Sequence, residues 1–190
     1  MAEGKDDTLN RFEELAIPLF DSLFNFAHWL TKDHDEAEDL VQEAFLKAWK
    51  GFGSFQPGTN FRAWLFRILR NSFLTSRTGL AARMTVPIED EEETHRVPTS
   101  TETPETNLIE RAGIERVRQA IEELPLPYRE VLLLCDVEEL TYHEISEALS
   151  IPIGTVMSRL ARARKKLREA LSEGQRGDSA KRKEAGYGLR

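Results

Sequence analysis

The sequence predicts an all-α protein made of two small helical domains joined by a flexible acidic linker. Apolar residues recur at three- and four-residue spacing through most of the 190 residues, and no long stretch alternates with the period of two that strands require. From about Val86 to Thr106 the chain instead holds prolines, serines, threonines and a run of five acids, Glu89–Glu93, with little to bury.

The expected domain bounds follow from this change in composition. We expect the first helical domain over residues 1–85, the linker over 86–106 and the second helical domain over 107–172. Residues 173–190 are rich in Gly, Lys, Arg and Glu, which predicts a disordered tail. Each domain is small, so each core will be only marginally stable by itself.

The first domain begins with one or two helices over residues 10–31, where apolar side chains are dense. Asp33, followed three residues later by Glu36, predicts the start of the next helix, and Gly51 predicts its end. After the loop SFQPGTN, a further helix begins at Phe61.

The second domain is predicted to start with a helix from Asn107, a plausible N-cap, to about Glu123. The segment LPLP ends that helix, and another helix spans roughly Tyr128–Asp136. Both segments carry apolar residues at helical spacing, so both contribute to the core of this domain.

The last two helices follow the helix-turn-helix plan. Thr141 and Glu144 form a capping-box pattern that starts a short helix; the glycine-containing segment SIPIGT turns the chain, and the last helix runs to about Leu171. One face of this last helix is apolar and should pack on the domain: Val156, Leu160, Ala163, Leu167 and Leu171. The opposite face and its flank carry one methionine and otherwise small or cationic residues: Met157, Ser158, Arg159, Ala161, Arg162 and Lys165. Six basic residues and no acid lie from Arg159 to Arg168, which suits base edges and phosphates of duplex DNA better than a merely solvated basic helix.

The stretch FRAWLFRILRN, residues 61–71, holds three arginines, three large aromatic residues and no carboxylate. On a helical wheel its apolar residues form a wide core face, Arg67, Arg70 and Asn71 lie opposite, and Trp64 lies at the border. Cations, an amide and a border aromatic suit single-stranded nucleic acid, and an unpaired base could enter a pocket walled by the loop Phe55–Asn60. The alternative, left open by the residues alone, is a core helix with an ordinary cationic rim.

Charge and composition exclude several function classes. The formal net charge is −7, but residues 141–190 carry eleven Lys and Arg against six Asp and Glu, a net of +5. Such asymmetry predicts different partners for different parts of the chain. The acidic N-terminus is not a signal peptide, and no apolar run approaches the ~18 residues of a membrane span. We therefore expect a cytoplasmic protein.

Catalytic and metal-site signals are weak. Lone Cys135 forms no intrachain disulfide and no Cys-x-x-Cys zinc pair, and it is predicted to be a buried small residue. A metal hydrolase using His28, Asp33 and His34 is an alternative, but acids that favour a helix N-terminus explain most of this cluster. We predict no enzyme, no cofactor, no metal and no small-molecule substrate.

Three blocks of the sequence together resemble the extracytoplasmic-function (ECF) sigma factors of bacterial RNA polymerase. They are DEAEDLVQEAFLKAWKGF, FRAWLFRILRN and LPLPYREVLLLCDVEELTYHEISEALSIPIGTVMSRLARARKKL, similar to regions 2.2, 2.3–2.4 and 4 of that family. The resemblance covers roughly residues 10–78 and 108–171. It implies a subunit that binds core RNA polymerase, through the clamp helices of the largest subunit and the flap of the second-largest, and directs it to promoter DNA.

The resemblance also implies three sets of site residues. The set for the polymerase clamp is Asp39, Gln42, Glu43 and Leu46. The set for the melted −10 strand is Phe55, Asn60, Arg62, Trp64, Arg67, Arg70 and Asn71. The set for the −35 duplex is Met157, Ser158, Arg159, Ala161, Arg162 and Lys165. The family often has Arg or Lys in place of Met157 and a bulky residue in place of Ala161, which leaves the −35 sequence preference open.

Further expectations concern regulation. The resemblance implies a linker that threads through the polymerase, where its five acids act either as a polyanion mimic or as a plain solvated spacer. The segments PGTNFRAWLFRILRN and IPIGTVMSRL are similar to a thiol-stress subgroup held inactive by a zinc-containing anti-sigma partner. A rival hypothesis is a stand-alone helix-turn-helix regulator, which predicts a dimer and a palindromic site.

Overall fold

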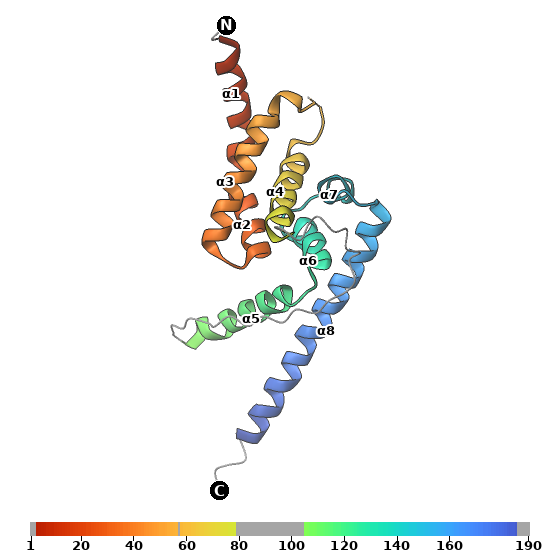
Figure 1. Cartoon of the computed structure of the whole chain (residues 1–190). Coiled ribbons are helices and arrows are strands. Elements are labelled where there is room, and N and C mark those ends of the chain that lie inside the picture. Colours follow the sequence, from red (N-terminus) through yellow and green to blue (C-terminus); the bar gives the residue numbers. More distant parts are fainter. Residues whose placement is uncertain (1–2, 57, 79–104, 186–190) are drawn as a thin grey trace. The chain divides into compact units, whose positions relative to one another are not determined.

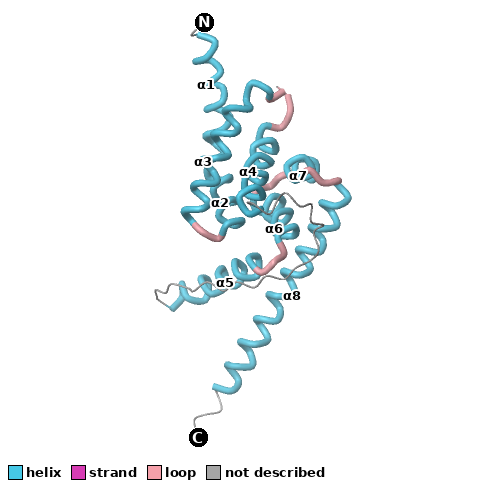
Figure 2. Tube along the Cα trace, viewed as in Figure 1, coloured by secondary structure: helices cyan, strands magenta, loops and turns pink. Residues whose placement is uncertain are grey.

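The computed structural model describes residues 3–56, 58–78 and 105–185, with side chains described at 7–56, 58–77 and 113–172. Every regular element in these residues is a helix (Figure 2). The predicted all-α class is therefore confirmed. The predicted linker over 86–106 falls almost wholly outside the described residues. None of the described helices is both long and apolar enough to cross a membrane.

The described residues form two compact units. The first unit holds the following elements: α1 (Glu3–Ala16), η1 (Ile17–Leu19), α2 (Phe20–Thr31), α3 (His34–Gly51), η2 (Phe52–Ser54), α4 (Phe61–Thr78), η4 (Leu133–Val137), α7 (Tyr142–Leu149) and the first residues of α8 (Ile153–Ala185). The second unit holds α5 (Glu105–Glu122), α6 (Leu126–Leu132) and α8 from Ser158 onward. The domain bounds expected from the sequence stay a prediction.

Local capping signals place two of the helix starts. The side chain of Asp33 accepts a hydrogen bond from the backbone N–H of Glu36, 2.9 Å away, and α3 begins at the next residue, as predicted. Thr141 and Glu144 form the full capping box predicted for α7. Each carboxylate or hydroxyl satisfies a backbone donor that the first helical turn leaves without an intrahelical partner.

Some helix bounds differ from the predicted ones. Helix α5 begins at Glu105, so Asn107 lies inside its first turn and is not the N-cap. The helix predicted over residues 128–136 is α6 followed by the π-helical turn η4, where the N–H of Glu138 donates to the carbonyl of Leu133. Helix α8 continues to Ala185, past the end expected near Leu171.

The core of the first unit lies among α2, α3 and α4, which pack side by side (Figure 1). Leu23, Phe26, Leu65 and Phe66 are almost fully buried there, and each contributes about 1.5–3 kcal/mol by leaving water. Phe12 joins α1 to this core through edge-on contacts with the rings of Phe45, Trp49, Phe52 and Phe61. Helix α4 is thereby fixed along its apolar face.

In the second unit, the buried side chain of Arg129 in α6 forms hydrogen bonds with the backbone at the end of α5. Its guanidinium donates to the carbonyls of Ile121, Glu122 and Leu124 at 3.2, 2.5 and 3.0 Å. These carbonyls close the last turn of α5 and the LPLP break, so they would otherwise lack donors. Burial lowers the pKa of Arg129, and the charges of Glu122 and Glu130 oppose that shift.

Candidate nucleic-acid interface

The start of α4 is fixed by Asn60, whose side-chain oxygen accepts the N–H of Ala63 at 3.0 Å. The carbonyl of Asn60 accepts the N–H of Trp64 at 3.1 Å, so this residue is the N-cap of α4. The sequence reading placed Asn60 in a base pocket and missed the capping role. An asparagine directly before the apolar-periodic run was the available signal.

Aromatic side chains meet beside this cap. The ring of Phe55 lies 5.1 Å from that of Trp64 and 5.3 Å from that of Phe61, and it stacks on Phe52 at 6.1 Å. Phe52 and Phe61 are buried, while Phe55 and Trp64 are half-exposed. The buried pair therefore supports two ring faces that solvent can reach.

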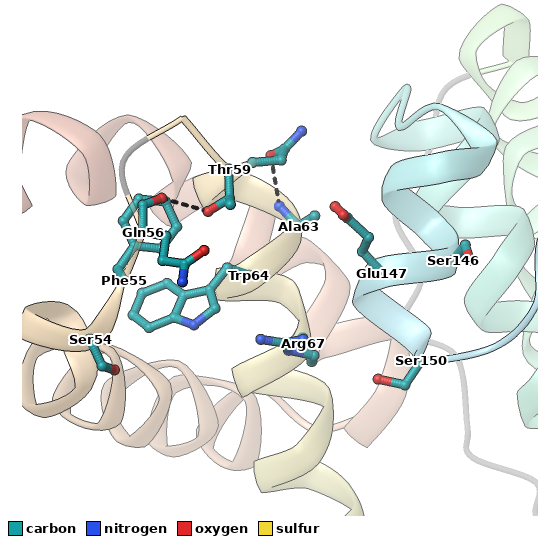
Figure 3. A pocket seen from close by; sticks show the side chains of 11 residues that line it. Ser54, Phe55, Gln56, Thr59, Ala63, Trp64, Arg67, Ser146, Glu147 and Ser150 are labelled. Atoms are coloured by element: carbon teal, nitrogen blue, oxygen red, sulfur yellow. Dashed lines mark hydrogen bonds between the residues drawn. The ribbon is translucent and has the colours of Figure 1, made fainter.

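These two rings line a cavity of about 480 Å³ within the first unit. Figure 3 shows Trp64 and Arg67 of α4 on one side of it and Glu147 and Ser150 on the other. The complete lining is Ser54, Phe55, Gln56, Thr59, Asn60, Ala63, Trp64, Arg67, Ser146, Glu147 and Ser150. Its volume falls in the range of small-ligand sites, ~300–1,000 Å³. The cavity combines flat apolar surface with an amide, a cation and hydroxyls.

The seven residues predicted for the −10 strand are only partly brought together. Four of them line the cavity: Phe55, Asn60, Trp64 and Arg67. Three of them do not: Arg62, Arg70 and Asn71. Asn71 is exposed on α4 one turn beyond Arg67.

Arg62 and Arg70 make contacts with the segment that contains α7. Nη2 of Arg62 lies 3.0 Å from Oε2 of Glu138, and its guanidinium carbon lies 5.7 Å from the centre of the Phe66 ring. Nη1 of Arg70 donates to the carbonyl of Leu149 at 3.5 Å. No local sequence pattern predicts these pairs, because the partners are 76 and 79 residues apart in the chain.

Glu144 is held by several donors at once. The hydroxyl and N–H of Thr141 donate to it at 2.7 and 2.6 Å, and the side-chain amide of Asn60 also donates to it. Burial opposes ionisation of Glu144, but these hydrogen bonds and the charge of Arg62 together hold its pKa below the ordinary value. The carboxylate is therefore charged at neutral pH.

The turn before α8 is built differently from the prediction. Ser150, at φ 55°, is the left-handed residue that ends α7, and the Ser146 hydroxyl donates to the carbonyl of Ile151 at 2.6 Å. Gly154, which the sequence reading placed in the turn, lies inside α8. The glycine is therefore not what reverses the chain.

Helix α8 shows the two faces that its periodicity predicts. Val156, Leu160 and Ala163 are buried, and Leu167 and Leu171 are half-buried. The predicted −35 set lies on the outer side, with Arg159 half-buried and the others exposed: Met157, Ser158, Ala161, Arg162 and Lys165. The side chain of Met157 stands out because it is 53% exposed at the beginning of the helix.

Helix α3 presents the predicted polymerase-binding residues to solvent. All four are exposed: Asp39, Gln42, Glu43 and Leu46. Leu46 is 60% exposed, and Glu43 pairs with Lys47 at 2.6 Å on the same face. This face of α3 is therefore open to a partner.

The histidine and acid cluster belongs to the packing of α2 and α3. Phe24 stacks on His28 and meets His34 edge-on, with ring centres 6.3 and 5.1 Å apart. The side chain of Asp33 is engaged as the α3 cap. Among the described side chains, no group of three or more potential ligands is placed to hold a metal ion.

Comparison with known proteins agrees with this geometry. Residues 19–82 match the family Sigma-70 region 2, and residues 114–167 match Sigma-70, region 4. The chain is 34% identical over 175 residues to the ECF RNA polymerase sigma factor SigE of Mycolicibacterium smegmatis. The aligned residues make up 90% of this chain and 66% of SigE, just under two thirds of the length of that relative. It is 37% identical over 152 residues to the ECF RNA polymerase sigma factor EcfG of Rhodopseudomonas palustris, covering 80% and 78% of the two chains.

Solved structures are similar as well. The sigma factor RpoE in complex with the anti-sigma factor NepR from Bartonella quintana matches with a TM-score of 0.63 and 29% identity, covering 85% of this chain and 97% of that one. CnrH in complex with the cytosolic domain of CnrY matches with a TM-score of 0.63 and 25% identity, covering 87% and 90%. Sigma factors are transcription initiation factors and not enzymes. The chain belongs to the ECF family of RNA polymerase sigma factors.

Proposed function

We propose that this chain binds core RNA polymerase and directs it to promoters, reading the −35 element as duplex and the −10 element as a melted strand. The observation that carries the proposal is the cavity at the start of α4. It places the rings of Phe55 and Trp64, the amide of Asn60 and the guanidinium of Arg67 around one space. A flipped base can stack on such rings and bond to an amide, while a cation follows the phosphate backbone.

The −35 duplex is assigned to the exposed start of α8. Ser158, Ala161 and Arg162 are exposed. We expect the small side chains of Ser158 and Ala161 to let the helix approach base edges, and Arg162 to bond a guanine. Arg159 and Lys165 flank this row and suit phosphates. Met157 and Ala161 are apolar, so we expect them to meet thymine methyl groups.

The polymerase is assigned to the exposed face of α3, where Leu46 lies among Asp39, Gln42 and Glu43. This face would bind the clamp helices of the largest subunit, and the C-terminal region would bind the flap of the second-largest. The matched stretches 19–82 and 114–167 lie inside the domains proposed for 1–85 and 107–172, which supports that division.

Regulation by an anti-sigma factor is part of the proposal. The structurally similar sigma factor RpoE was solved with the anti-sigma factor NepR, and the structurally similar CnrH was solved with the cytosolic domain of CnrY. We place the chain in the cytoplasm with the polymerase. The narrower assignment to a thiol-stress subgroup with a zinc-containing partner rests on the segments around residues 57–71 and 151–160. In that case the redox sensor lies in the partner, because Cys135 cannot form an intrachain disulfide.

Run-off transcription with core RNA polymerase on genomic promoter fragments tests the function. We expect defined start sites only when the protein is added, and weaker transcripts with Arg67→Ala. The matched control is Arg11→Ala, which removes an exposed arginine of α1 that does not line the cavity. If no transcript forms while the protein alone binds a palindromic duplex tightly, the stand-alone helix-turn-helix regulator replaces this proposal.

A further inference from the structure

The −10 face of α4 is already engaged by another part of the same compact unit. Helix α7 packs against α4 (Figure 1), and both belong to the first unit. The segment Glu138–Ser150, here called the α7 clasp, supplies every contact described below. Three of the seven residues proposed for the −10 strand bond to it: Asn60, Arg62 and Arg70.

The strongest of these contacts is the ion pair between Arg62 and Glu138. The side chain of Glu138 is only 6% exposed, while that of Arg62 is 32% exposed. A carboxylate buried to this degree requires a charged partner, because an unpaired buried charge is costly. While the pair is formed, Arg62 is not available to a phosphate.

The other two contacts spread over two turns of α4. The amide of Asn60 donates to Glu144, the capping carboxylate of α7, and Arg70 donates to the last carbonyl of that helix, on Leu149. Arg62 and Arg70 are eight positions apart, so they lie about two turns apart along α4 and about 80° apart around it. The clasp therefore contacts a broad area of the helix rather than a single point.

The clasp also closes one wall of the cavity. Ser146, Glu147 and Ser150 line it, and Figure 3 shows Glu147 and Ser150 opposite Trp64 and Arg67. Glu147 brings a third carboxylate, after Glu138 and Glu144, to the cationic side of α4. The three carboxylates lie against arginines and an amide of α4. They therefore resemble the DNA phosphates that these arginines and this amide would bind.

We propose that the α7 clasp is an internal competitor of the −10 strand, which occupies the recognition face of α4 in the free protein and must leave before an unpaired base enters. This inference rests on the proposed function of the α4 cavity. The clasp lowers the apparent affinity of the free chain for single-stranded DNA in proportion to the fraction of molecules in which it is closed. Core polymerase would then also raise the affinity for the −10 strand, if it binds the form of the chain in which the clasp is released more tightly than the closed form.

The test uses the full chain and a fluorescently labelled single-stranded oligonucleotide that carries the −10 element mapped by run-off transcription. The variant Glu138→Gln/Glu144→Gln removes two clasp charges, and glutamine at position 144 still completes a capping box with Thr141. The control Glu13→Gln/Glu115→Gln makes the same change in net charge at two exposed positions outside the clasp, neither of which has a described contact with α4. It accounts for the general gain in DNA affinity that any loss of acids produces.

We expect the clasp variant to bind the oligonucleotide about five-fold more tightly than the control variant, the lower end of typical coupling between two sites. Equal affinities of the two variants, with the parent protein active in run-off transcription, would overturn the clasp and leave the proposed function intact. Absence of transcripts with the parent would remove the function, and the clasp with it.

A second measurement does not depend on any substitution. Hydrogen exchange of the parent protein is followed with and without saturating oligonucleotide. We expect amides of residues 142–149 to exchange faster when the oligonucleotide is bound, because α7 has left α4. Unchanged or slower exchange there would contradict the clasp even if the glutamine variants failed to fold.

Discussion

Helix α4 and the start of α8 are the two helices proposed to contact promoter DNA, yet they present their polar side chains in different ways. On α8, Met157, Ala161 and Arg162 are exposed. On α4, Arg62 and Arg70 reach carbonyl and carboxylate groups of the segment around α7. The comparison teaches that a recognition face read from helical periodicity can be open in one helix and already occupied in another.

The largest effect that separates the two helices is on stability. Arg62→Ala leaves the nearly buried carboxylate of Glu138 without its partner, and we expect a loss of about 2–3 kcal/mol in the free energy of unfolding. Arg162→Ala removes an exposed side chain and should change that free energy by less than about 0.5 kcal/mol. Urea unfolding followed by circular dichroism measures both, and equal midpoints for the two variants would refute the structural role of Arg62.

The next effect is on duplex binding. Arg162→Ala should weaken binding of the holoenzyme to a −35 duplex by about 1–3 kcal/mol and relax the preference at one base pair, if the guanidinium bonds a guanine in the bidentate way. The control Arg168→Ala lies further along α8, outside the predicted base-reading row. A binding series over all four bases, unchanged by Arg162→Ala, would exclude a base contact by this residue.

The smallest effect concerns acid. The pKa of Glu144 is below its ordinary value in the folded chain, so its contribution to stability is present above the unfolded pKa of about 4.3 and is lost as the pH falls through the folded-state pKa. The stability difference between the parent and Glu144→Gln should therefore be constant near neutrality and shrink below about pH 4. Thermal unfolding from pH 7 to pH 3 measures this difference. A difference that grows toward low pH would contradict the inferred direction.

Features set by neighbouring residues were predictable from the sequence. The Asp33 cap, the Thr141–Glu144 capping box and the buried face of α8 all depend on side chains within a few positions of one another. The N-cap role of Asn60 was missed, although its position before an apolar run was a usable signal.

Features that depend on distant pairs were not predictable. Arg62 meets Glu138 76 positions later, and no periodicity or capping rule reports such a contact. The same holds for the cavity, whose two walls come from residues 54–67 and 146–150. The π-helical turn η4 and the left-handed Ser150 also differ from the regular helix and glycine turn that the residues favoured.

The central claim is that α4 binds the melted −10 strand and α8 binds the −35 duplex. The most direct test measures two quantities on the same promoters: the permanganate reactivity of the thymines and the amount of bound holoenzyme. We expect Asn71→Ala and Arg67→Ala to bind promoters in nearly normal amounts but to lose reactivity at the −10 thymines. Arg162→Ala should reduce binding, while the complexes that do form should react normally. The same ratio of reactivity to binding in all three variants would contradict this division of roles.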